Sequence, residues 1–171
     1  MISIRQERPG DVAAVREINE KAFGQPTEAG IVDSLREACS DAVSLVAVKD
    51  GRVVGHVFFS PVTVEGGAGT ARGMGLAPLA VRPECRRQGV GSRLVEAGLE
   101  ALRRRACPFV IVVGDAKYYA RFGFVPASLH GLACQWEGVP EEAFMALILD
   151  SSAMAGVSGV ARYRSEFDPA V

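Results

Sequence analysis

Residues 82–98 read RPECRRQGVGSRLVEAG, and this stretch decides the fold. It joins an apolar run to a segment with helical periodicity, so a helix begins inside it. The first backbone N–H groups of a helix have no partner within the helix. Glycines at positions 89 and 91 leave these donors accessible, and the helix dipole adds a partial positive charge. With Arg86 and Arg87 beside them, the junction predicts a binding site for a phosphate group.

The segments on either side of this junction predict a βαβ unit. Leu76–Val81 has the composition of a strand, and Gly89–Ala106 carries its apolar residues on one helical face. Phe109–Val113 is a continuous apolar run, which indicates a strand buried on both faces. Two strands of one sheet that are joined through a helix run parallel. We therefore expect a parallel pair at the centre of the chain.

The N-terminal half predicts two amphipathic helices and an antiparallel hairpin. Asp50-Gly51 between two Val-rich and Phe-rich runs is a strong signal for a tight hairpin turn. The expected elements are a strand at Ile2–Arg5, a helix capped by Asp11, a helix over Thr27–Cys39, and strands at Val43–Val48 and Arg52–Val64.

The C-terminal half predicts shorter elements. Glu65–Gly75 is rich in glycine and indicates a wide turn. Asp115 is expected to cap a short helix that ends at Phe122, and strands are expected from Phe124 and over Phe144–Leu149. The tail, residues 150–171, is expected to be irregular. The fold class is thus α/β (α+β): one domain, 1–171, with a mixed, mostly antiparallel sheet flanked by helices.

Charge and cysteine content limit the classes of function. With 19 basic and 20 acidic residues the chain is near neutrality, which disfavours nucleic acid and membrane surfaces as partners. The four cysteines form no CxxC pair, no metal-ligand spacing is visible, and no secretory leader or bilayer-spanning run is found. We expect free thiols, no metal and a cytoplasmic protein.

Two motifs carry a resemblance to a known family. The junction lacks the GK[ST] of a P-loop and the GxGxxG of dinucleotide-binding folds. Residues 86–91, RRQGVG, instead resemble the [RQ]xxGx[GA] acyl-CoA signature of the GNAT superfamily of N-acetyltransferases, and residues 118–124, YYARFGF, resemble its later aromatic-GF motif. Gly114-Asp115 and the tail sequence GVSG, residues 156–159, are similar to the bacterial YhbS-like branch.

The resemblance implies acetyl-CoA (coenzyme A) as the cofactor and a GNAT-like fold. The pyrophosphate would lie on the amides of residues 87–92, and the pantetheine arm along residues 79–81. The implied cofactor-binding residues are Leu79, Ala80, Val81, Arg86, Arg87, Gln88, Gly89, Val90, Gly91, Ser92 and Tyr119.

The resemblance also implies acetyl transfer by direct attack of a primary amine, from a small molecule or from a peptide or protein. Tyr119 would donate a hydrogen bond to the departing sulfur, with Tyr118 as the competing candidate. Residues 75–80 offer no carboxylate, so Glu28 or His56 would take the amine proton, or water would carry it away. A homodimer through the C-terminal strands is compatible with the apolar segment 144–149.

Three other functions stay open at this point. A non-catalytic acyl-CoA sensor would use the same junction without the chemistry. An enzyme with a longer acyl donor would share the fold, and an RNA-binding module would show steep salt dependence. A covalent route through Cys85 is disfavoured because no histidine neighbours it in the sequence.

Overall fold

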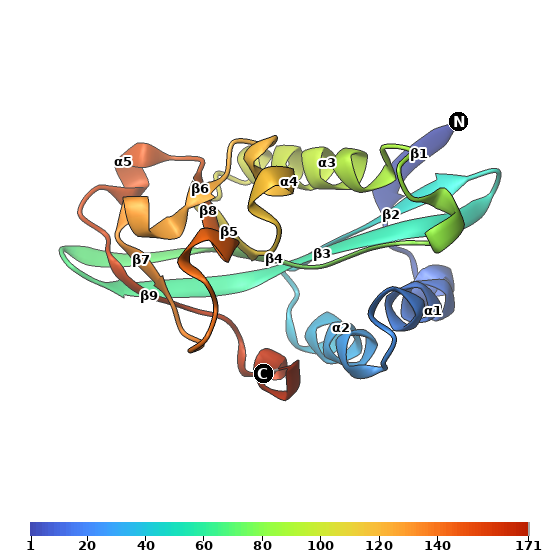
Figure 1. The fold of residues 1–171 in the computed structure, drawn as a ribbon, viewed down its shortest axis with the longest axis horizontal. Coiled ribbons are helices and arrows are strands. Elements are labelled where there is room, and N and C mark those ends of the chain that lie inside the picture. Colours follow the sequence, from blue (N-terminus) through green and yellow to red (C-terminus); the bar gives the residue numbers. More distant parts are fainter. Residues whose placement is uncertain (171) are drawn as a thin grey trace. The chain divides into compact units, whose positions relative to one another are not determined.

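The computed structural model describes residues 1–170, and Figure 1 shows the order of its elements. The α-helices are α1 (Val12–Phe23), α2 (Thr27–Ala38), α3 (Val90–Arg104), α4 (Ala116–Ala120) and α5 (Ser151–Met154). The strands are β1 (Ile2–Gln6), β2 (Val43–Lys49), β3 (Arg52–Gly66), β4 (Gly69–Val81), β5 (Phe109–Val113), β6 (Val125–Pro126), β7 (Leu132–Cys134), β8 (Phe144–Ile148) and β9 (Gly159–Arg162). Short 3-10 helices are η1 (Pro9–Asp11), η2 (Pro83–Cys85), η3 (Ala127–His130), η4 (Glu141–Ala143) and η5 (Ser165–Ala170).

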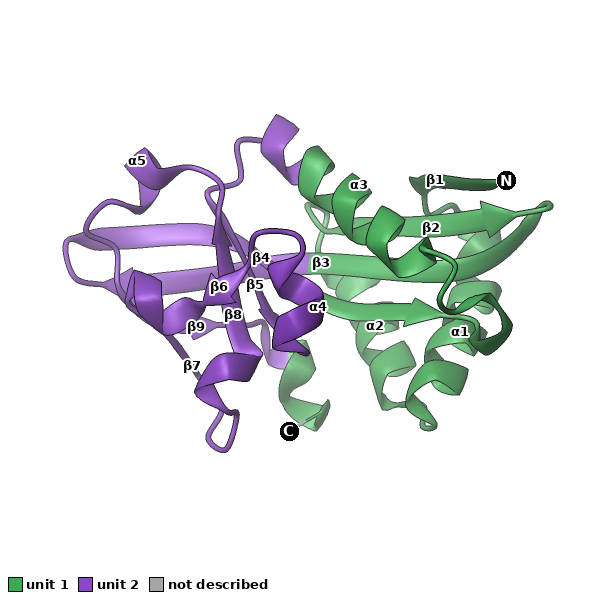
Figure 2. Cartoon of the chain, turned by 45° about the horizontal axis from the view of Figure 1, so that its top comes forward, with its two compact units in different colours: residues 1–59, 77–101, 166–171 green, residues 60–76, 102–165 purple. Residues whose placement is uncertain are grey.

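The chain divides into two compact units, coloured separately in Figure 2. The first contains residues 1–59, 77–101 and the chain from 166 onward, and the second contains residues 60–76 and 102–165. The long strands β3 and β4 contribute to both units. The expectation of one domain for residues 1–171 stays a prediction, and its last residue, Val171, lies outside the described residues.

The sheet of the first unit is antiparallel, with β1 beside β2 and β2 beside β3. The turn between β2 and β3 has positive φ at both central residues, 52° at Asp50 and 75° at Gly51. This is the backbone that a two-residue hairpin loop requires for strands with a right-handed twist. The predicted hairpin is confirmed.

Helix α3 packs closely against strand β3 in the first unit. Its apolar residues Val90, Leu94, Val95 and Leu99 are buried, as the periodicity predicts. A Cβ atom at Gly98 would lie 2.2 Å from Cε1 of Phe59, far inside contact distance. The absent side chain therefore admits the Phe59 ring against the helix backbone, which fixes α3 on the strand.

The second unit contains the predicted parallel pair. Met74 and Gly75 of β4 pair with Val110 and Ile111 of β5 in parallel. Strand β4 also neighbours β3, and further pairs are antiparallel between β5 and β8, β6 and β8, and β3 and β9, and parallel between β7 and β9. This mixed, mostly antiparallel sheet confirms the predicted fold class. Strand β5 is buried except at its end, where Val113 is 41 % exposed.

Two predicted segments are wrong. The Glu65–Gly75 region is not a wide turn, because β3 continues to Gly66 and β4 begins at Gly69. Gly73 permits close packing, since a Cβ atom there would lie 2.4 Å from the Phe109 carbonyl oxygen. The tail after residue 150 is not irregular, because it forms α5, β9 and η5.

Asp11 precedes α1 as predicted, but it does not cap that helix with its side chain. Its carboxylate accepts hydrogen bonds from the Arg5 guanidinium at 2.6 and 3.1 Å and from the Arg8 amide at 2.7 Å. These bonds lower the pKa of Asp11, the Arg5 bond most strongly. The carboxylate thus ties β1 to η1 instead of closing the helix end.

Candidate functional site

The junction between β4 and α3 lies within the first unit and leads through η2 into the helix. Arg87 and Gly89 have φ values of 61° and 79°, in the left-handed region. Two left-handed residues so close together turn the chain sharply before the helix begins. Glycine adopts this conformation without the steric cost that a Cβ atom brings, which explains position 89.

Helix α3 begins within this junction, as the sequence predicts. The Arg93 N–H donates to the Gly89 carbonyl at 3.1 Å, which begins the helical pattern. The N–H groups of Val90 and Gly91 precede that pattern, and the first N–H groups of a helix have no acceptor within the helix. Arg86, Arg87, Gln88 and Gly89 are exposed, whereas Val90 is buried and anchors the first turn. An anion therefore has access to this end of a 15-residue helix.

The predicted cofactor-binding residues of β4 alternate in exposure. Leu79 and Val81 are half-buried, and Ala80 between them is buried. Successive side chains of a strand point to opposite faces, so Leu79 and Val81 share the more open face. The first unit thus brings together residues 79–81 and 86–92, where Gly91 and Ser92 are half-buried.

Arg82, at the start of the junction, binds β3 and α1 through its side chain, a role that the sequence did not predict. Only 4 % of Arg82 is exposed. Its Nε donates to the Val53 carbonyl at 2.9 Å and its Nη1 to Glu17 at 3.1 Å. Hydrogen bonds from Lys21, first, and from Arg82 lower the pKa of Glu17 to about 2. No sequence signal distinguishes this buried arginine from its exposed neighbours.

The Gln88 side chain both accepts and donates a hydrogen bond. Its Oε1 accepts from Lys49 at 3.1 Å, and its Nε2 donates to the Glu84 carbonyl at 3.2 Å. These contacts hold the turn between η2 and α3. Gln88 therefore contributes mainly to the shape of the loop.

Tyr119 belongs to the second unit and is 8 % exposed. Asp115 caps α4 as predicted, because its Oδ1 accepts from the amides of Lys117 at 2.8 Å and Tyr118 at 3.1 Å. The Tyr119 ring packs edge-on against Phe124, with centroids 5.7 Å apart. Burial, and then the neighbouring Tyr118, raise the pKa of Tyr119, so its hydroxyl keeps its proton.

The absence of a side chain at Gly114 gives Tyr119 its place. A Cβ atom there would lie 2.6 Å from Cε2 of the ring. Tyr118, the competing candidate, is half-buried, and the Arg121 guanidinium lies 5.1 Å from its ring centre. The two adjacent tyrosines therefore have different environments, one closed and one partly open.

The two candidate bases also differ. Glu28 lies in the first turn of α2 and accepts from the Gln25 amide at 2.9 and 3.3 Å. His56 is completely buried, and both ring nitrogens are within hydrogen-bond distance of side chains, Asn19 at 3.2 Å and Ser44 at 2.9 Å. Burial, with a smaller effect of Arg36, lowers the pKa of His56 to about 3. His56 is thus an internal residue of the first unit, and its burial disfavours it as the base.

His56 belongs to a chain of hydrogen bonds that we call the His56 chain, formed by Asn19, His56, Ser44, Glu7 and Arg36. The Asn19 amide donates to Nδ1, so Nε2 carries the proton and donates to Ser44. The Ser44 hydroxyl donates to Glu7 at 3.0 Å, and Arg36 donates to the same carboxylate at 3.0 and 2.7 Å. These hydrogen bonds link the five side chains of the His56 chain to one another within the first unit.

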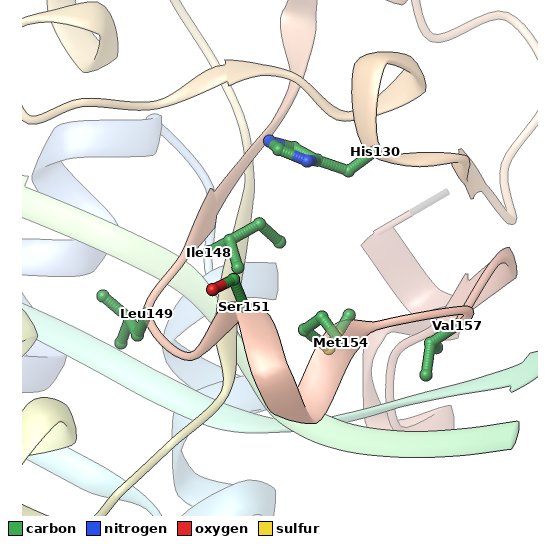
Figure 3. A pocket seen from close by; sticks show the side chains of 6 residues that line it. All are labelled: His130, Ile148, Leu149, Ser151, Met154 and Val157. Carbon is green, nitrogen blue, oxygen red and sulfur yellow. The ribbon is translucent and has the colours of Figure 1, made fainter.

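Two hollows of similar volume lie in the second unit. One of about 330 Å³ is lined by residues of η3, β8 and α5, with His130 across from Ile148 and Ser151 (Figure 3). The other, of about 380 Å³, lies between β7 and η4 and contains Trp136 and Phe144 in its wall. The second one is lined by carboxylates as well as by apolar residues.

Metal clusters, membrane-spanning helices and disulfides are absent from the described part of the chain. Among residues 1–170, no group of three or more His, Cys, Asp or Glu side chains is placed to hold a metal ion. None of the helices in this range is long and apolar enough to cross a membrane. The four cysteines form no disulfide.

Comparison with known proteins agrees with this architecture. Residues 3–127 match the family described as acetyltransferase (GNAT) domain. The chain belongs to the GNAT family of N-acetyltransferases.

Among its relatives is an uncharacterised N-acetyltransferase of Escherichia coli K12, YhbS, with 39 % identity over 166 residues, or 96 % of this chain and 98 % of YhbS. The crystal structure of E. coli YhbS in complex with CoA gives a TM-score of 0.89 at 37 % identity, over 98 % of this chain and 92 % of that one. A GNAT acetyltransferase from Brucella melitensis, crystallised with acetyl-CoA, gives a TM-score of 0.79 at 34 % identity, over 98 % and 99 % of the two chains.

Proposed function

We propose that this protein transfers the acetyl group of acetyl-CoA to a primary amine, by direct attack of the amine nitrogen on the thioester carbonyl. The observation that carries the proposal is the turn at Arg87 and Gly89, which opens the first amides of α3 to an anion. The two relatives crystallised with CoA and acetyl-CoA support the same donor.

In this proposal the first unit binds the cofactor. The amides of residues 87–92 hold the pyrophosphate, and Arg86 and Arg87 add charge-assisted hydrogen bonds. The half-buried face of Leu79 and Val81 lies along the pantetheine arm, with backbone groups of Ala80 as hydrogen-bond partners. Acetyl-CoA supplies an activated acetyl group, so the protein needs to position it and to stabilise charge.

Tyr119 is proposed to stabilise the departing sulfur. As the C–S bond breaks, negative charge develops on sulfur, and the protonated Tyr119 hydroxyl donates a hydrogen bond to it. A thiol has a pKa of about 8.5, and burial raises the pKa of Tyr119 above the usual value for a phenol, so full proton transfer is uphill. Tyr119 therefore acts as a hydrogen-bond donor, and the thiolate takes its proton from water.

Glu28 is proposed to receive the proton that the amine loses, directly or through one water molecule. Its carboxylate is half-buried at the start of α2 and is oriented by the Gln25 side chain. The closed environment of His56 supports this choice between the two candidates. A matched comparison is available on the same helix, because Glu37 is exposed.

The experiment combines binding and chemistry. Calorimetry with acetyl-CoA tests the first step, and release of free thiol in the presence of a library of amines tests the second. We expect Tyr119→Phe to keep the affinity for acetyl-CoA and to lower kcat by about 10²-fold, and Glu28→Gln to do the same while Glu37→Gln does not. Binding without thiol release from any amine would identify a sensor, and absence of binding would remove the proposal.

The setting proposed for this reaction is the cytoplasm, with an amine from a small molecule or a peptide as acceptor. The near-neutral charge of the chain supports neither nucleic acid nor a membrane surface as partner. A homodimer stays a prediction, which light scattering tests.

A further inference from the structure

The hollow of about 380 Å³ in the second unit has a lining of unusual charge. Its apolar wall includes Leu132, Trp136, Val139 and Phe144, and its acidic side chains are Glu137 and Glu141. We call it the Trp136 pocket. No lysine, arginine or histidine lines it. An apolar wall with carboxylates and without cations favours a ligand that combines an apolar body with a positive charge.

The geometry of the Trp136 pocket is fixed by the elements around it. The Ser128 hydroxyl donates to Oε1 of Glu141 at 2.6 Å, which joins η3 to η4 across the pocket and holds the carboxylate in place. The Trp136 ring stacks on the Tyr163 ring, with centroids 4.6 Å apart and an interplanar angle of 29°. One face of the indole is therefore covered, and half-buried Trp136 contributes its remaining surface to the pocket.

The other hollow of the second unit lacks this combination. It is also apolar, but no carboxylate lines it, and its only ionisable side chain is His130. An ammonium group would find no counter-charge there. The two hollows are thus similar in volume, but only the Trp136 pocket is lined by carboxylates that could attract an ammonium group.

The Trp136 pocket is connected to Tyr119 through the backbone of the second unit. Phe144 in its wall pairs with Val113, and the Gly114 N–H donates to the Ala143 carbonyl at 2.9 Å. Gly114 is the residue against which the Tyr119 ring packs. The pair of strands β5 and β8, which contributes Phe144 to the pocket wall, therefore also leads into Gly114, against which Tyr119 packs.

We propose that the Trp136 pocket binds the acceptor and selects a primary amine with an aromatic or bulky apolar body. The body packs against Trp136 and Phe144, and the ammonium form is attracted by Glu137 and Glu141 before it loses its proton. A ring face of tryptophan also attracts a cation directly. The assignment of the ligand as acceptor rests on the proposed acetyl transfer, whereas binding in the pocket does not.

Trp136 is the single tryptophan of the chain, so its fluorescence reports on this pocket alone. The probes are 2-phenylethylamine and 2-phenylethanol, which have the same shape but differ in charge, each titrated without acetyl-CoA. We expect the amine to change the fluorescence and to bind about three- to tenfold more tightly than the alcohol. Glu137→Gln and Glu141→Gln should each weaken amine binding about threefold, and Glu142→Gln, whose side chain is outside the lining, should not.

Transfer is then measured with 2-phenylethylamine as acceptor. Glu141→Gln should raise KM for the amine by about the same factor and leave KM for acetyl-CoA unchanged. Equal affinity for alcohol and amine, or an unchanged fluorescence with both, overturns the pocket. Fluorescence binding without any transfer retains the pocket but removes its role as the acceptor site, whereas transfer with unaltered KM in Glu141→Gln places the acceptor elsewhere.

Discussion

Two polar regions of the first unit differ in whether their hydrogen-bonding groups have partners inside the protein. At the junction, helix geometry gives the N–H groups of Val90 and Gly91 no acceptor within α3, and the side chains of residues 86–89 are exposed. In the His56 chain, both ring nitrogens and the Glu7 carboxylate are used inside the protein. Both regions are polar in the sequence, and they differ in burial: the proposed binding surface is exposed, whereas His56 is buried.

The largest effect that tests this comparison concerns stability and pH. An unfolded histidine has a pKa of about 6.5, and the pKa of His56 in the folded protein is lowered to about 3. Between these values the unfolded chain binds a proton that the folded protein does not, so stability falls as the pH falls. We expect His56 to remove about 2 kcal/mol of unfolding free energy between pH 7 and pH 5.

Urea unfolding at both pH values measures this loss. His56→Gln should be less stable at pH 7 but should lose much of the dependence on pH between 7 and 5. The second histidine of the chain, His130, is exposed, and His130→Gln is the matched control that should keep the dependence. A stability that is equal at pH 7 and pH 5 in the unmodified protein would contradict the closed character of the His56 chain.

The next effect should act on the affinity for acetyl-CoA, with a loss of stability of about 1–2 kcal/mol. A Cβ atom at Gly89 meets nothing within 4 Å, so Gly89→Ala is disfavoured by its φ of 79° alone. The left-handed conformation costs about 1–2 kcal/mol for an alanine, and relaxation of the turn would displace the amides. We expect the affinity for acetyl-CoA to fall about tenfold in calorimetry. Gly10→Ala, in open space and without a positive φ, is the control.

The smallest effect is expected from the guanidinium groups at the junction. Arg86→Gln and Arg87→Gln should each weaken acetyl-CoA binding about three- to fivefold at low salt, because exposed charges contribute modestly. The difference from the unmodified protein should shrink at high ionic strength. Arg103→Gln removes an exposed charge near the other end of α3 and should leave the affinity unaltered. Equal effects at both ends would indicate general attraction by charge and not a site.

The parts of the fold that could be predicted from the sequence have local, periodic patterns. Helix α3 repeats its apolar residues, β5 is a continuous apolar run, and Asp50-Gly51 has the turn chemistry of a hairpin. Asp115 likewise caps α4 through bonds to the next few amides. In each case the decisive interactions lie within a few residues of one another.

What could not be predicted depends on distant neighbours. Gly73 resembles a turn residue until the Phe109 carbonyl is found where its side chain would be. The short strand β9 pairs with β3 and with β7, far from it along the chain. The burial of Arg82 and of His56 follows from the surrounding elements and not from their own sequence context. The burial that disfavours His56 as a base therefore could not be predicted from the sequence.

The contact between Gly98 and Phe59 has a consequence for evolutionary drift. Position 98 lies eight residues, or roughly 12 Å, along the helix from Val90, at the rise of a regular α-helix. A methyl group at position 98 would collide with the Phe59 ring and tilt α3. The tilt would displace the start of the helix at Val90. Natural variation at Gly98 should thus be as restricted as at Gly89 in the junction, although Gly98 lies outside the proposed cofactor-binding residues.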